Sequence, residues 1–355
     1  MVGKLRLRVR SLWSNDVTKL LLFLVATFAL AAFLVPQVYN LGMFLGEITA
    51  NKSVNPFLDY VGTHARKADY ARFFNRSLYL AALILLPFLL FSLEAKKAIA
   101  TTRGPWSFAL PARSIAPNRG QALVRPPHPF RQVLGGFLLG SVFLSAAGAL
   151  AILFGFFGWK GTSPSAVIPE AMTTATVVAL LEEFIFRGVI LGIFLRTFRP
   201  SFAIVFAAFL FAFLHFLRPP DGLVMANPEG LWTGFDFLQV TVQRLFEWEL
   251  ILLQFAPLLL AGVLLGVTRF LTSSLWLPVG LHAGWVFAFT VFGDLATPRE
   301  GHPEWTNFVI GENLAQGLLP LATLGMSALI IWVVYREPDY YEEVHPDSPL
   351  DPSPT

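Results

Sequence analysis

The chain alternates between long apolar runs and shorter polar segments. A helix that crosses a bilayer takes about 20 mostly apolar residues. Runs of that kind fall at about residues 20–46, 78–93, 132–158, 170–195, 201–217, 250–268, 275–293 and 314–335. No segment repeats at a fixed period. The pattern therefore predicts an all-α, polytopic integral membrane bundle of about eight transmembrane helices.

Composition supports a membrane protein and excludes several other classes. The 355 residues are 55% hydrophobic and 14% charged, against about 25% charged in an average soluble protein. So few charges cannot cover a soluble domain of this length, and 35 Phe exclude low-complexity disorder. The chain has no Cys, which rules out disulfides, thiolate chemistry and Cys-based metal sites.

The positive charges predict an orientation. If the amino terminus is inside, the inside segments carry 16 of the 26 Lys and Arg, which favours cytoplasmic amino and carboxyl termini. The basic start followed by Leu20–Val35 would also suit a signal peptide, but the apolar run continues past Pro36 and favours an uncleaved anchor. Because the basic residues flank apolar runs, topology explains them and nucleic-acid binding is not expected.

The sequence LEEFIFRG at residues 181–188 places three charges inside an apolar run. Each costs about 2.5–3.5 kcal/mol at the centre of a membrane helix, so the three must pair or line a wet cavity. Glu183 and Arg187 have the favourable i,i+4 spacing for an ion pair. Glu182 lacks that partner and is suited to act as a general base. A packing clasp or a re-entrant loop is the alternative.

Two histidines also lie in apolar runs: His215 in FAFLHF and His282 in LPVGLHAGW. A single intramembrane His is more often an interhelical hydrogen bonder, but two beside a Glu-Glu-Arg cluster favour function. Their imidazoles could hold a water, an oxyanion or a metal. His215 falls near the outer end of its run and His282 in the inner third of its own, so a meeting at Glu182 requires tilted helices or shifted boundaries.

The residue types limit the chemistry. The chain has no Cys, no GxSxG, no HExxH and no Asp pair in neighbouring runs. The catalytic residues of thiol, serine, aspartyl and ordinary zincin proteases are therefore missing. What remains is Glu182 deprotonating a water, supported by the two histidines. The same three side chains could bind zinc with a water as fourth ligand. Water activation without metal or other cofactor is the first interpretation.

Three segments resemble, in order and spacing, the motifs of a known family. They are EEFIFRG at Glu182–Gly188, FAFLH at Phe211–His215 and SLWLPVGLHAGW at Ser274–Trp285. They resemble the CAAX protease and bacteriocin-processing family (CPBP or Abi), the intramembrane glutamic endopeptidases that include the prenyl-protein endoprotease Rce1. The likeness covers about residues 170–293. It implies a helical bundle of about eight spans with the site in a cavity among four core helices.

The resemblance also implies roles for the site residues. Glu182 falls on the glutamate that activates water, and the supporting positions fall on Glu183, Arg187, His215 and His282. The family usually has Asn or Asp four residues after the last His, where this chain has Val286. Loss of such a donor can lower a rate about a hundredfold. Trp285 offers an indole N–H one position away.

The sequence predicts three parts. Residues 1–158 hold the first spans and the basic loop 94–131, which is expected to lie on an anionic membrane surface or to dock a partner. Residues 159–335 form the protease-like region. Residues 336–355 form an acidic, Pro-rich, unstructured tail.

The main functional hypothesis is an intramembrane endopeptidase that cleaves near the carboxyl terminus of a membrane-anchored or lipidated substrate. Because Val286 breaks the family pattern, the alternative is a catalytically weak protein with a binding, immunity or chaperone role in the membrane. A proton-relay transporter is less favoured, since the sequence has no inverted repeat.

Overall fold

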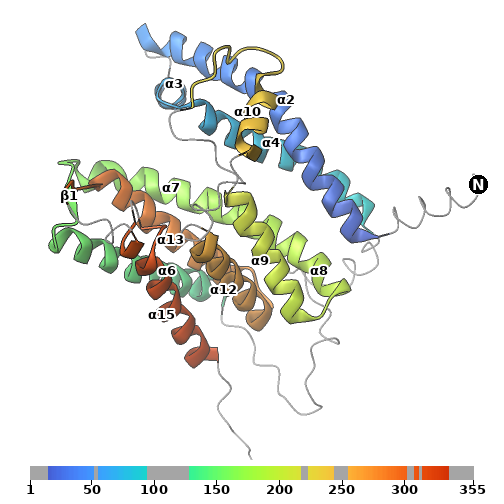
Figure 1. The fold of residues 1–355 in the computed structure, drawn as a ribbon, viewed down its shortest axis with the longest axis vertical. Helices are drawn as coiled ribbons and strands as arrows, with labels where there is room; N and C mark the ends of the chain where they lie inside the picture. Colours follow the sequence, from blue (N-terminus) through green and yellow to red (C-terminus); the bar gives the residue numbers. More distant parts are fainter. Residues whose placement is uncertain are drawn as a thin grey trace, which may run out of the picture.

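The structure is a computed structural model that describes residues 15–51, 55–93, 128–216, 223–243, 255–301, 308–311 and 314–335. Almost all of these residues are helical, which confirms the all-α prediction (Figure 1). The basic loop, apart from its last residues 128–131, and the acidic tail lie outside the described residues. Each of the eight apolar runs contains at least part of a helix.

One group of helices, here called the α2–α4 layer, lies along the upper side of the molecule in Figure 1. It consists of α2 (Asp16–Asn51), α3 (Pro56–Arg66), α4 (Tyr70–Ser92) and α10 (Thr233–Gln243). Asn55 and Asp69 cap α3 and α4 by accepting from the backbone N–H of Leu58 and Arg72, both at 2.8 Å. The sequence pattern did not predict α3 and α10, because both lie in segments interpreted as polar loops.

The remaining helices form a second group, the core layer. It contains α6 (Pro129–Leu153), α7 (Pro164–Glu183), α8 (Leu191–Thr197), α9 (Pro200–Phe216), α12 (Ala256–Thr272), α13 (Trp276–Leu295) and α15 (Leu318–Tyr335). A π-helix, η1 (Phe184–Ile190), joins α7 to α8. Strands β1 (Phe157–Trp159) and β2 (Ala296–Pro298) pair antiparallel and tie the ends of α6 and α13 together.

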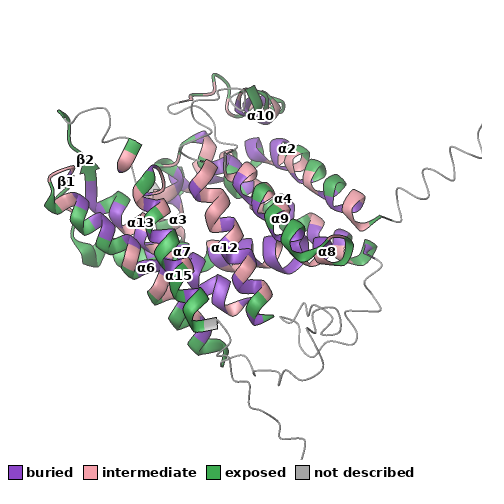
Figure 2. Ribbon diagram, turned by 60° about the horizontal axis from the view of Figure 1, so that its bottom comes forward, coloured by how far each residue is buried: buried purple, intermediate pink, exposed green. Residues whose placement is uncertain are grey.

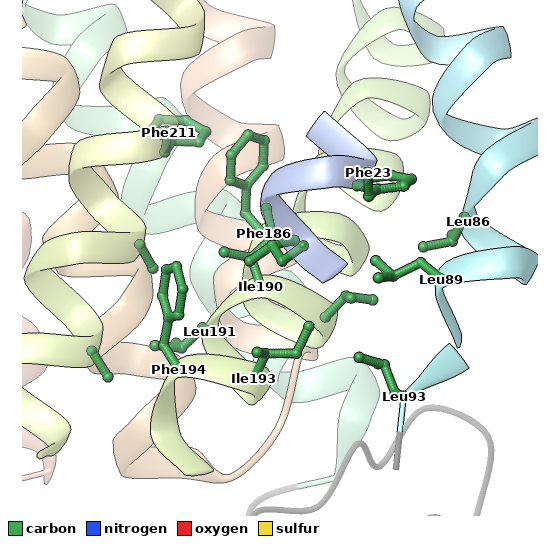
Figure 3. Packing of buried hydrophobic residues seen from close by; sticks show 14 of the residues in the cluster. Phe23, Leu86, Leu89, Leu93, Phe186, Ile190, Leu191, Ile193, Phe194 and Phe211 are labelled. Carbon is green, nitrogen blue, oxygen red and sulfur yellow. The ribbon is translucent and has the colours of Figure 1, made fainter. Parts of the chain in front are cut away.

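An apolar cluster joins the two layers (Figure 3). Phe23 comes from α2, Leu86 and Leu89 from α4, Phe186 and Ile190 from η1. The cluster continues through Phe194 of α8 to Phe211 of α9, whose ring meets that of Phe186 edge-on at 5.1 Å. The α2–α4 layer is thus docked on the part of the core layer that follows the two glutamates.

Outward-facing apolar side chains indicate a lipid environment. Phe91 and Leu153 are 72% and 77% exposed, and Figure 2 shows exposed positions along the outer faces of α6 and α15. Among the described residues, α2, α4, α6 and α13 are long and apolar enough to cross a bilayer, while α9, α12 and α15 are shorter apolar helices. These features are those of an integral membrane protein.

Glycines let α6 and α13 touch along their backbones. Gly136 and Gly140 on α6 face Gly280 and Gly284 on α13, and a Cβ atom at any of the four positions would overlap backbone atoms of the other helix. Each pair has the GxxxG spacing that allows close helix approach in membranes. This seam fixes the rotation of α13 about its own axis.

The seam predicts different effects for two adjacent substitutions. A Cβ at Gly136 would lie 2.7 Å from the Leu277 carbonyl oxygen, whereas a Cβ at Gly135 has nothing within 4 Å. Gly136→Ala is expected to destabilise the protein by about 1–3 kcal/mol through overpacking, and Gly135→Ala to leave it unchanged or slightly stabilised. Thermal unfolding in detergent, followed by tryptophan fluorescence, measures both. Equal midpoints for the two variants would contradict the close seam.

Candidate functional site

The charged cluster lies where an α-helix passes into a π-helix. Glu182 and Glu183 end α7, and Arg187 lies in the middle of η1. All three are buried, with 5%, 0% and 3% of their surfaces exposed. Short π segments occur often at functional sites, because the wider turn redirects side chains. The charges therefore face the protein interior and not lipid.

The Glu183 carboxylate accepts hydrogen bonds from two side chains. Arg187 Nη1 donates to Glu183 Oε1 at 2.7 Å, and His282 Nδ1 donates to the same oxygen at 2.8 Å. Arg187 Nη2 also reaches the carbonyl oxygen of Gly262 on α12 at 3.3 Å. The guanidinium lies 4.4 Å from the centre of the Phe211 ring, a cation–π distance. Glu183 thus connects η1 to α13 and is engaged in orienting His282.

Glu182 presents its two oxygens to different partners. The Tyr79 hydroxyl of α4 donates to Oε1 at 2.5 Å. Oε2 faces the Nε2 atoms of His215 and His282 at 3.2 and 3.8 Å. The carboxylate is therefore anchored on one side and open to both imidazoles on the other.

The outer nitrogens of the two imidazoles determine what their inner nitrogens do. His215 Nδ1 lies 2.8 Å from the Phe211 carbonyl oxygen, which can only accept, so Nδ1 donates. His282 Nδ1 donates to Glu183. In the neutral form each ring then carries its lone pair on Nε2. Both nitrogens lie near Glu182 Oε2, so three acceptor atoms are close together. This arrangement suits a water that donates one hydrogen to the oxygen and the other to one of the nitrogens.

The glycine seam explains why His282 reaches this point. Gly280 and Gly284 face α6, and position 282 lies two residues from each, which places it about 200° around the helix from Gly280. The side chain therefore points away from α6 and toward α7. The contact of both histidines with Glu182 also resolves the depth conflict expected from the linear topology.

A cavity of about 490 Å³ opens onto these side chains. Most of its lining is apolar. The α2–α4 layer contributes Phe23 and Tyr79, and the core layer contributes Glu182, His215, His282 and Val286. Trp285 also lines the cavity, so its indole belongs to the wall of the site. An apolar pocket with a few convergent polar groups is the usual form of a small-molecule or peptide site.

The zinc alternative can be compared with this geometry. Two imidazole nitrogens and one carboxylate oxygen are donor types that zinc accepts. Within the described ranges, however, no group of three His, Asp or Glu side chains is arranged to hold a metal ion.

The structure brings all five residues singled out in the sequence into one connected group: Glu182, Glu183, Arg187, His215 and His282. Sequence reasoning missed Tyr79. It lies in the apolar run 78–93, where it is the only aromatic residue with a hydroxyl. That isolated polar tip was the available signal.

Comparison with known proteins gives one match. Residues 164–288, about a third of the chain, match the family model described as Rce1-like, type II CAAX prenyl endopeptidase Rce1-like. The match contains all five of these residues and ends two residues after Val286. No curated protein and no solved structure matches the chain at a significant level.

The buried pair predicts a large loss of stability when it is broken. Arg187→Met leaves the Glu183 carboxylate buried without its main counter-charge, which is expected to cost about 3–5 kcal/mol. Glu170→Gln is the control, because Glu170 lies on the same helix α7 and pairs with His64 at 3.2 Å while 46% exposed. Such a surface pair contributes about 0–1 kcal/mol. Denaturant unfolding in mixed micelles measures both, and equal losses would contradict a stabilising pair at Arg187.

Proposed function

Because residues 164–288 match the family model of the Rce1-like CAAX endopeptidases, we propose that this protein is an intramembrane endopeptidase that uses Glu182 to activate water. The family assignment supports protease-type hydrolysis in general. The roles of individual residues and the substrate class are part of the proposal. The observation that carries it is the buried Oε2 of Glu182 facing two imidazole Nε2 atoms within one cavity.

The proposed reaction follows from the three converging acceptors. A water between them donates one hydrogen to Glu182 Oε2 and the other to an imidazole Nε2, which leaves an oxygen lone pair for attack on a peptide carbonyl carbon. Glu182 takes one proton of the water, and the other hydrogen stays on the attacking oxygen. An imidazole that has taken up a proton from solvent before the attack carries N–H on both nitrogens and donates to the oxyanion that forms. When the C–N bond breaks, the proton held by Glu182 passes to the leaving nitrogen.

The cavity suggests the kind of substrate. Its lining is mostly apolar, and it lies among helices whose outer faces suit lipid. A peptide tethered to the bilayer is concentrated at this depth, and an apolar group on it would be buried on binding. We propose cleavage near the carboxyl terminus of a membrane-anchored or lipidated protein by the region 159–335.

Val286 favours a second candidate. It lines the cavity one helical turn beyond His282, at the position where the family usually carries Asn or Asp. A side chain without a donor there would leave a transition state less stabilised. The second candidate is a protein that binds a membrane partner in this cavity, in an immunity or chaperone role, with little hydrolysis.

Substitution of Glu182 separates the two candidates. Purified protein in proteoliposomes is given internally quenched peptides anchored by an S-farnesyl cysteine near the carboxyl terminus or by an amino-terminal palmitoyl chain. Glu182→Gln is expected to lower kcat by about 10²–10⁴-fold through loss of the base. His215→Ala and His282→Ala are each expected to lower it by about a hundredfold.

Glu170→Gln, on the same helix and away from the cavity, is the matched control and should retain wild-type turnover. Full activity of Glu182→Gln would contradict the proposed mechanism. Binding of either peptide without cleavage by the wild-type protein, unchanged in Glu182→Gln, would support the second candidate.

We also propose that both termini face the cytoplasm. The chain has no Cys, so single cysteines can be placed without background. Asn15 precedes α2 and Lys67 follows α3, and both are exposed. In intact cells a membrane-impermeant maleimide should label Lys67→Cys and should label Asn15→Cys only after lysis. The reverse pattern would invert the proposed orientation.

A further inference from the structure

We propose that Tyr79 of α4 is a positioning residue of the active site, which orients the Glu182 carboxylate so that Oε2 acts as the base. This inference rests on the function proposed above. It adds to the site a helix from outside the family-matched residues 164–288.

The contact itself is the first support. A separation of 2.5 Å between the Tyr79 hydroxyl and Glu182 Oε1 lies in the range of charge-assisted O–H···O⁻ hydrogen bonds. These bonds are about twice as strong as neutral ones. The hydroxyl hydrogen is committed to Oε1, so Tyr79 is not itself a proton donor to substrate in this arrangement.

The arrangement around Glu182 shows why the bond matters. The carboxyl group turns easily about its last torsion, since terminal sp³–sp² torsions are broad. The histidines are fixed by their outer nitrogens on Phe211 and Glu183, but among the described residues Oε2 makes no aligned hydrogen bond of its own. Within the described part of the chain, Tyr79 therefore supplies the directional hydrogen bond that holds the plane of the carboxylate.

Tyr79 is in turn held by the docking of α4. Ala82 and Leu86, which follow it on the helix, are buried in the cluster shared with η1 and α9 (Figure 3). On the preceding turns, Phe73 and Phe74 are buried in the cluster that α4 shares with α2 and α10. The turns of α4 before and after Tyr79 are both packed against other helices. The position of the Tyr79 hydroxyl therefore follows from the packing of the two layers.

Turnover measurements on Tyr79→Phe, with the two anchored peptides described above, test this role. Loss of one hydrogen bond to a charged group is expected to lower kcat by about tenfold to a hundredfold. The aromatic ring that lines the cavity is kept, so KM should stay within about twofold of wild type. Tyr70→Phe is the matched control, because Tyr70 begins the same helix and its buried hydroxyl has no hydrogen-bond partner in the described part of the chain.

The outcomes separate this inference from the proposed function. Wild-type kcat in Tyr79→Phe while Glu182→Gln is inactive overturns the role of Tyr79 and leaves the mechanism standing. Full activity in Glu182→Gln overturns both. A drop in Tyr79→Phe that appears only in KM, or together with an equally lowered unfolding midpoint, would show a role in packing and overturn positioning. Equal loss of kcat in Tyr70→Phe would do the same.

Discussion

Two adjacent carboxylates buried in a membrane protein are the constraint on which the rest of the structure depends. Glu182 and Glu183 are both almost fully buried, and each charge is expensive at that depth unless it has partners. Glu183 is satisfied by Arg187 and His282, and Glu182 by Tyr79 on one oxygen with two imidazoles near the other. These partners come from η1, α13, α4 and α9. Satisfying two charges thus specifies the relative placement of helices distant in sequence.

The residues of the candidate site stand out in the sequence because they interrupt apolar runs. In a chain with few charges, Glu182, Glu183 and Arg187 stand out inside a membrane-length segment, and His215 and His282 do so in two others. Their convergence could not be predicted, because a linear topology contains neither helix rotation nor tilt. The glycine seam that turns His282 toward α7 depends on which face of α6 it meets. Tyr79 was overlooked since one aromatic hydroxyl in an apolar run has many ordinary explanations.

The hydrophobic pattern predicted the long apolar helices of the fold. It did not predict the shorter helices between them or the changes in helix type. All eight runs contain helix, because hydrophobic length is a strong signal. The helices α3 and α10 were missed because they are amphipathic or short and pack on α2 and α4 instead of crossing the membrane by themselves. The change from α- to π-helix after Glu183 was also not predicted, since the hydrophobic pattern gives the apolar run and not the hydrogen-bond spacing within it.

The length of α2 has a consequence for how the protein responds to its bilayer. Its 36 residues form a rod of about 54 Å at 1.5 Å per residue. The hydrocarbon layer is about 30 Å thick, and even a tilt of about 40° accommodates only about 39 Å of helix. Part of α2 therefore extends beyond the hydrocarbon, and hydrophobic mismatch acts on its tilt. Because α4 packs along α2, a change in the tilt of α2 would be passed to α4, the helix that carries Tyr79.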